Sequence, residues 1–192
     1  YLARTGLDAL KGADILKTAA DSYTSTIEYA ETGIAQSLRG MAQVIFKGLG
    51  TRVLYTSQGG YDTHANQVSV QTPLLSDLSA GIGDFFADLS EHDAADNVMM
   101  LVFTEFGRRV KDNGSGSDHG SGGGCYLIGQ PVKGGTLGDY PSLKEEDQLD
   151  GDLHFNVDFR SVYSTIVDKW LGLDAQTAIG GNYETLDFVR SN

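Results

Sequence analysis

The stretch Val98-Met99-Met100-Leu101-Val102-Phe103 is the longest uninterrupted apolar run of the chain, and it decides the expected fold. Its residues do not alternate between apolar and polar, so the run predicts a strand buried on both faces, as in a parallel sheet covered by helices. Shorter apolar runs predict further strands at 51–57 and 125–128. Apolar residues at helical spacing predict helices at 2–23, 27–49, 75–89 and 159–170, the third of which could start near residue 66 with Pro73 as a kink.

The alternation of helices and strands predicts a single α/β domain over residues 1–192, with a mostly parallel sheet flanked by helices in an α/β/α sandwich. Residues 107–124 are expected to form a Gly-rich loop, and residues 130–157 a surface excursion with few apolar anchors. The chain begins at Tyr1 rather than at Met and enters a helical pattern at once. We therefore expect a processed or truncated portion of a longer parent.

The composition is acidic, with 26 Asp and Glu against 14 Lys and Arg and a formal net charge of −12 at pH 7. Such a field repels polyanions and the basic residues are scattered, so nucleic-acid binding is not expected. No run approaches the ~18 to 20 apolar residues that span a bilayer, so no transmembrane segment is expected. The single cysteine, Cys125, excludes an intrachain disulfide and is expected to be a small buried core residue.

Polar side chains that can ligate a metal follow the predicted strands. Asp62 and His64 come after the strand at 51–57, Glu105 follows the central apolar run, and Asp118 and His119 precede the strand at 125–128. Open α/β sheets place their ligands beyond the carboxyl ends of their strands. Because carboxylate oxygen and imidazole nitrogen together suit zinc, iron or manganese, these residues predict a metal site.

Simpler interpretations of the same residues stay open. Asp62 and His64 could be a capping residue and a surface histidine of a turn, and Glu105 could pair with Arg108 or Arg109. The Gly-rich segment lacks the Lys-Ser/Thr ending of a nucleotide-binding P-loop, and as a calcium loop it lacks the twelfth-position Glu. Of the remaining residues, His92 and His154 are expected to be solvated and Trp170 to lie in the core.

Three motifs occur in succession: Gly59-Gly60-Tyr61-Asp62-Thr63-His64, Thr104-Glu105-Phe106-Gly107-Arg108 and Gly116-Ser117-Asp118-His119-Gly120. Together with Val132-Lys133-Gly134-Gly135 and the segment from Phe159 to Gly172, they resemble the motifs of the bacterial domain-of-unknown-function family 1501, in the same order. The resemblance covers roughly residues 25–172. That family is grouped with the alkaline-phosphatase and sulfatase superfamily and its members usually carry twin-arginine export signals. The resemblance therefore implies an alkaline-phosphatase-like fold and a periplasmic or extracellular location.

The superfamily holds two metal ions beside a hydroxyl or formylglycine nucleophile. By resemblance, Asp62, His64 and His119 are ligands of one ion, Glu105 is a carboxylate of the second site, and Asp118 is either a ligand or an acceptor that orients His119. The resemblance implies zinc first, with manganese, iron or calcium as alternatives.

The superfamily's early Asp ligand and its nucleophile should lie upstream of Tyr1. By resemblance this chain is the C-terminal half of the domain, and the missing N-terminal half is an expected partner. We expect a metal-dependent hydrolase of phosphate or sulfate esters, including phosphorylated or sulfated glycans, with Arg108 as an anion clamp. The alternative is a non-catalytic exported binding or assembly module on the same scaffold.

Overall fold

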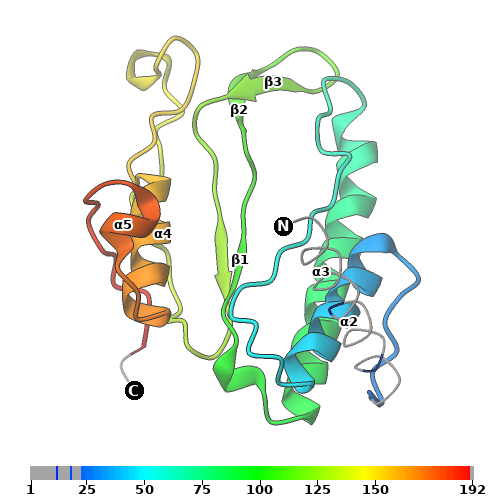
Figure 1. Ribbon diagram of the computed structural model, residues 1–192. Coiled ribbons are helices and arrows are strands. Elements are labelled where there is room, and N and C mark those ends of the chain that lie inside the picture. Colours follow the sequence, from blue (N-terminus) through cyan, green and yellow to red (C-terminus); the bar gives the residue numbers. More distant parts are fainter. Residues whose placement is uncertain (1–11, 13–17, 19–22, 191–192) are drawn as a thin grey trace, which may run out of the picture. The chain divides into compact units, whose positions relative to one another are not determined.

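The computed structural model describes Gly12, Thr18 and residues 23–190, which form two compact units. The first unit comprises residues 1–61 and 71–95, and the second comprises residues 62–70 and 96–192 (Figure 1). Of the helix predicted at 2–23, only Gly12, Thr18 and Tyr23 are described; Gly12 and Thr18 are helical and Tyr23 is not.

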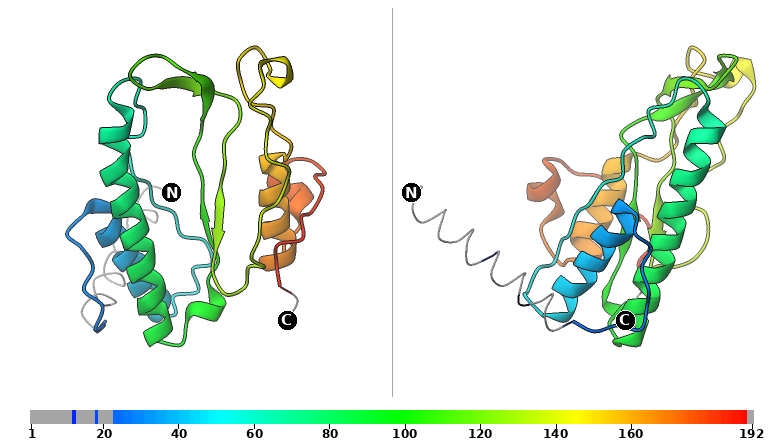
Figure 2. Two further views of the ribbon diagram at one scale, coloured as in Figure 1. Left: turned by 180° about the vertical axis from the view of Figure 1, so that it is seen from behind. Right: turned by 90° about the vertical axis from the view of Figure 1, so that its right-hand side faces the viewer.

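The first unit contains helix α2 (Gly33–Phe46) and most of helix α3 (Gln67–Glu91), which lie side by side in Figures 1 and 2. Both helices were predicted from their apolar spacing, and Pro73 lies inside α3. The Thr32 hydroxyl accepts a hydrogen bond from the backbone N–H of Ala35, so α2 begins later than the pattern suggested. A side chain added at Gly81 would meet Ala35 at 3.4 Å, which shows how closely the helices approach. The apolar core of this unit consists of Tyr29, Ile34, Ala35, Leu38, Ala42, Phe85 and Leu89.

The strand predicted at 51–57 is wrong. This segment has no strand, and the side chains of Val53 and Tyr55 are 69% and 74% exposed. An apolar run favours extended backbone, but a strand also requires a hydrogen-bonded neighbour, and none pairs with this segment among the described residues.

The second unit contains two small antiparallel sheets. Strand β1 (Met100–Val102) pairs with β4 (Tyr126–Ile128), and β2 (Gly107–Asp112) pairs with β3 (Ser117–Gly120). The residues 107–124 that were expected to be a loop thus contain a β-hairpin. Gly107 is required there, because a Cβ atom at this position would lie 1.7 Å from the carbonyl oxygen of Gly122.

The predicted α/β/α sandwich with a mostly parallel, alkaline-phosphatase-like sheet is wrong, because both sheets formed by the described residues are two-stranded and antiparallel. The apolar run at 98–103 forms a strand only over Met100–Val102, whose residues are half-buried, and Phe103 is exposed. An apolar run does not specify strand direction. A parallel pair needs a crossover connection, whereas β1 reaches β4 through the β2–β3 hairpin.

The C-terminal part of the second unit is helical. Helix α4 (Phe159–Thr165) continues into a π-helical turn, η3 (Ile166–Trp170), and helix α5 (Ala175–Ile179) follows. Two short 3₁₀ turns lie earlier in the chain, η1 (Ala95–Asn97) and η2 (Glu145–Asp147). The helix predicted at 159–170 is confirmed. Residues 131–133 bond to 188–190 through backbone hydrogen bonds, which brings the end of the described chain back against this unit. The buried residues here include Val162, Phe188, Ser161, Ser164 and Thr165.

The expectations for Cys125 and Trp170 are wrong. Cys125 is exposed rather than buried, because it lies just before β4 instead of within a covered strand. Trp170 is half-buried at the end of η3 and does not belong to the fully buried core. None of the described helices is long and apolar enough to cross a membrane.

Candidate metal centre

The segment that follows Tyr61 is held against the turn of the β2–β3 hairpin, all within the second unit. The backbone N–H of Asn66 donates to the Ser115 hydroxyl at 2.9 Å, and the Ser117 hydroxyl donates to the Gln67 side chain at 2.9 Å. A Cβ atom at Gly116 would lie 3.0 Å from the carbonyl oxygen of His64. The hairpin can therefore approach the His64 backbone only because glycine occupies this position.

Asp62, His64 and His119 converge at this place. The Oδ1 atom of Asp62 lies 2.7 Å from Nε2 of His119 and 3.1 Å from Nε2 of His64. The two imidazole rings are stacked, with centroids 4.8 Å apart. One ligand atom from each of the three residues lies within 4.8 Å of the others, and the side chains are 68%, 50% and 42% exposed. The three residues that the sequence analysis grouped therefore lie together, and their role as metal ligands stays a prediction.

Asp118 contacts His64 rather than His119, the residue that one of its two expected roles would have it orient. Its Oδ1 atom lies 3.0 Å from Nδ1 of His64 and also accepts a hydrogen bond from the Asn113 amide at 3.2 Å. The same amide donates to the His64 carbonyl oxygen at 2.9 Å. Both ring nitrogens of His64 thus face carboxylate oxygens, Asp118 at Nδ1 and Asp62 at Nε2, and a carboxylate oxygen only accepts. A cation that replaced the proton on Nε2 would leave Asp118 to hold the proton on Nδ1 and so to fix the orientation of the ring.

His119 is fixed by an aromatic contact that the sequence did not suggest. The Phe106 ring stacks on the His119 ring with centroids 3.8 Å apart and an interplanar angle of 11°. Arg108 lies on β2, and its guanidinium is 5.0 Å from the centroid of the Phe106 ring. The only sequence signal for this role is the position of Phe106 beside Gly107 in the second motif.

Arg108 also connects the two parts of the centre. One guanidinium nitrogen donates to the Ser117 carbonyl oxygen at 2.6 Å, and another lies 3.5 Å from the buried Thr63 hydroxyl. This arrangement ties β2 to β3 and to the segment that carries Asp62. The role of Arg108 as an anion clamp stays a prediction.

Both carboxylates of the cluster are stabilised in their ionised form. The hydrogen bond from His119 lowers the pKa of Asp62, and the hydrogen bond from His64 lowers the pKa of Asp118. A carboxyl group must be deprotonated to ligate a metal ion, and Asp62 is ionised at neutral pH, so its oxygens are available to a cation there.

A scan against protein-family models matched residues 8–184 to the family described as "Protein of unknown function (DUF1501)". The chain belongs to this family. Comparison with the curated proteins and with the solved structures gave no match. The matched range includes every residue of the DUF1501 chain's Asp62–His64–His119 cluster and the hairpin that supports it.

The remaining predicted residues of the DUF1501 chain lie elsewhere. Glu105 is exposed and is not part of the ligand group, so its role at a second ion stays a prediction. His154 is exposed, as expected. His92 is not solvated, because both of its ring nitrogens contact backbone carbonyl oxygens.

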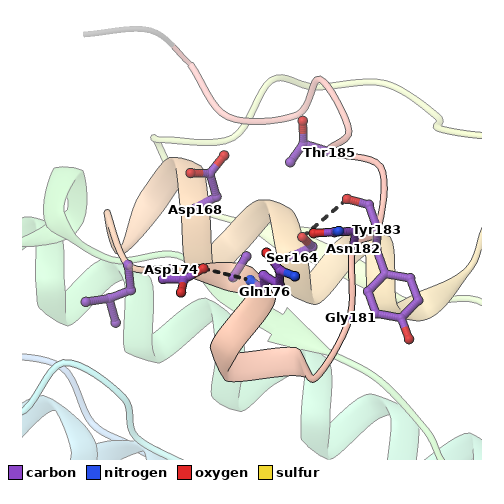
Figure 3. Close-up of a pocket in the computed structure, with 10 residues that line it drawn as sticks. Ser164, Asp168, Asp174, Gln176, Gly181, Asn182, Tyr183 and Thr185 are labelled. Carbon is purple, nitrogen blue, oxygen red and sulfur yellow. Dashed lines mark hydrogen bonds between the residues drawn. The ribbon is translucent and has the colours of Figure 1, made fainter.

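A separate hollow of about 310 Å³ lies against α5 (Figure 3). Figure 3 shows that its polar side chains are used locally: Asp174 bonds to the backbone N–H of Gln176, and the Ser164 hydroxyl lies 3.5 Å from the Tyr183 carbonyl oxygen. Asp174 is the N-cap of α5. No residue that lines this hollow belongs to the metal-ligand group.

Proposed function

We propose that Asp62, His64 and His119 bind one divalent metal ion, zinc before manganese, iron or calcium, and that this centre hydrolyses phosphate or sulfate esters. The observation that carries the proposal is the convergence of one oxygen and two nitrogen ligand atoms from positions up to 57 residues apart. Two histidines and one carboxylate form a ligand set typical of catalytic zinc.

The spacing of the donor atoms suits such an ion. In a tetrahedral zinc site with bonds of about 2.0–2.1 Å, ligand atoms lie about 3.3–3.4 Å apart. The Asp62–His64 and Asp62–His119 contacts of 3.1 and 2.7 Å are slightly shorter, as expected for hydrogen bonds between the same atoms. Small side-chain rotations would convert one arrangement into the other.

A bound divalent ion would neutralise the charge of an ester oxyanion and lower the pKa of water. Among the described residues three side chains group at this place, and all three are open to solvent, which leaves room for water and substrate. The neighbouring hydroxyls are otherwise engaged, since Thr63 is buried and Ser117 donates to Gln67. Water is therefore the nucleophile in this proposal, rather than a side-chain hydroxyl.

The protein's own residues would orient the reaction. Asp118 holds the proton on Nδ1 of His64, and Phe106 restricts the rotation of His119. Arg108 supplies positive charge beside Phe106 and is the candidate for steering an anionic group. A small anionic ester or an anionic glycan outside the cytoplasm is the substrate that we propose.

The test is metal analysis combined with an activity screen. Purified protein and a His64→Ala/His119→Ala variant are dialysed against zinc, manganese or iron, and bound metal is measured by mass spectrometry. The exposed His154→Ala variant is the matched control. We expect one equivalent of metal in the wild type and the control and much less in the double variant. Equal, negligible metal in all three would contradict the metal centre.

Aryl phosphate and aryl sulfate substrates then separate an enzyme from a non-catalytic binding module. Turnover that depends on metal and is lost in the double variant supports the hydrolase. Stoichiometric metal binding without turnover of either substrate would instead support the binding module.

A further inference from the structure

The first unit contains a cluster of ionisable residues around the buried Asp88, with no part in the metal centre. It consists of Asp88, Glu91 and His92 at the end of α3 and of Tyr23 and Tyr29 in the segment before α2. Asp88 is fully buried. One of its carboxylate oxygens accepts hydrogen bonds from the hydroxyls of both tyrosines, that of Tyr29 at 2.8 Å.

His92 links α3 to this earlier segment through both ring nitrogens. Nδ1 lies 2.9 Å from the carbonyl oxygen of Asp88, and Nε2 lies 2.9 Å from the carbonyl oxygen of Thr24. A carbonyl oxygen can only accept a hydrogen bond, and neutral imidazole has only one N–H. Both contacts can be hydrogen bonds only if both nitrogens carry protons. The geometry therefore fits the imidazolium form, which makes both hydrogen bonds at once.

The surroundings of His92 favour a positive charge. The second carboxylate oxygen of Asp88 has no hydrogen-bond partner and lies 3.3 Å from Nδ1 of His92. A buried carboxylate without a counter-charge is costly, and the imidazolium supplies one. The His92 ring stacks on Phe46 of α2, with centroids 4.0 Å apart. His92 also follows the last residue of α3, where the helix dipole favours a cation.

Glu91 holds the same segment by a separate set of bonds. Its carboxylate accepts hydrogen bonds from the backbone N–H of Thr26 at 3.1 Å, from the Thr26 hydroxyl at 2.9 Å and from the Ser25 hydroxyl at 3.3 Å. The segment 23–29 is thus attached to the end of α3 at three places. Only the attachment at His92 depends on a proton that is exchanged near neutral pH.

We propose that His92 is a proton-dependent clasp, which fastens the segment 23–29 to α3 as an imidazolium and releases it when the proton is lost. Deprotonation leaves one carbonyl oxygen without its donor and Asp88 without its counter-charge. Both losses act on the attachment at Thr24, so the segment loosens there, while the bonds from Glu91 and the tyrosines hold and the helices remain packed through Leu38, Phe85 and Leu89.

The direction of the pH effect follows from the contacts. The hydrogen bond to the Asp88 backbone, aided by the one to Thr24, raises the pKa of His92 above 6.5. A raised histidine pKa means that the clasp is fully present below the unfolded value and is lost as the pH rises through the folded value. The ionisable groups that face His92 are Asp88 and Glu91 from α3 and Tyr23 from the segment, whereas α2 contributes the Phe46 ring.

The tyrosines do not titrate in the same range. Burial and the hydrogen bond to Asp88 raise the pKa of Tyr23 to about 12, and the same causes raise the pKa of Tyr29. Their hydroxyls therefore remain donors to Asp88 while His92 loses its proton. A transition at mildly alkaline pH would belong to the histidine.

The protonation state is tested directly by NMR of ¹⁵N-histidine-labelled wild-type protein. At about pH 6 both ring nitrogens of His92 should show the shifts of protonated nitrogen, and the transition to neutral imidazole should occur above 6.5. A neutral ring at that pH, or a transition at or below 6.5, would overturn the proposal. So would zinc-dependent shifts of His92 in the His64→Ala/His119→Ala variant, which would mean that a metal rather than a proton joins these groups.

Release of the segment is tested by hydrogen exchange at about pH 6 and about pH 9, with each rate divided by the intrinsic rate at that pH. In the wild type we expect residues 23–30 to exchange at least tenfold faster at the higher pH, and α2 to change little. The His92→Gln variant, whose amide cannot replace the charge, should show the fast rate at both values, whereas His154→Gln should behave as the wild type. Equal wild-type rates at the two pH values would refute the clasp.

Discussion

Replacing Asp118 with Asn should weaken zinc binding at the candidate centre by about tenfold to a hundredfold, the usual effect of losing a group that orients a metal ligand. The Oδ1 atom of Asp118 lies 3.0 Å from Nδ1 of His64 and fixes the proton there. An amide of the same size keeps the volume but removes the negative charge, so it orients the ring more weakly and no longer raises the basicity of Nε2. The three ligand atoms remain, so the loss should stay below that of His64→Ala.

The measurement is a zinc titration in competition with a chromophoric chelator, carried out at one pH on metal-free protein. Asp139→Asn, a change of an exposed aspartate outside the centre, is the matched control and should leave the affinity unchanged. An Asp118→Asn variant that binds zinc within twofold of the wild type would refute the orienting role. A wild type that binds no zinc would instead refute the metal centre itself.

Three further predictions concern stability and pH. Leu89→Ala should lower the free energy of unfolding by about 2–5 kcal/mol in urea denaturation, because Leu89 is fully buried between the helices. Thr165→Val should cost about 1–3 kcal/mol in the same assay, because the buried hydroxyl that accepts from the Leu186 N–H is lost, whereas Thr165→Ser should retain most of the stability. Hydrogen bonds from Thr26 lower the pKa of Glu91 in the folded protein. Its contribution to the free energy of unfolding is therefore present above pH 4.5 and is lost as the pH falls through the lower folded pKa. Acid unfolding of the Glu91→Gln variant should show a weaker pH dependence in that range.

The centre combines residues whose contacts could not be read from their spacing. The motifs supplied Asp62, His64 and His119 as one group, and the structure agrees. They did not indicate that Asp118 turns away from its neighbour His119 to contact His64, 54 positions earlier. In a β-strand adjacent side chains point to opposite faces, so Asp118 and His119 on β3 cannot serve the same neighbour equally.

The sequence by itself determined the features that depend on local spacing. Helix α3, the helix that starts at Phe159, the family and the three residues of the candidate metal centre were all identifiable, because apolar periodicity and short motifs lie within a few turns of the chain. Only the tertiary structure decided the strand direction, since an apolar run has the same pattern in a parallel and an antiparallel pair.

The tertiary structure also decided the state of His92, which looked like a solvated histidine in the sequence. Its partners are a carbonyl 68 positions earlier and a carboxylate one turn before it, and these acceptors favour the doubly protonated ring that we propose. Protonation and ligand orientation depend on which groups meet in space, and these contacts form only when distant segments pack together.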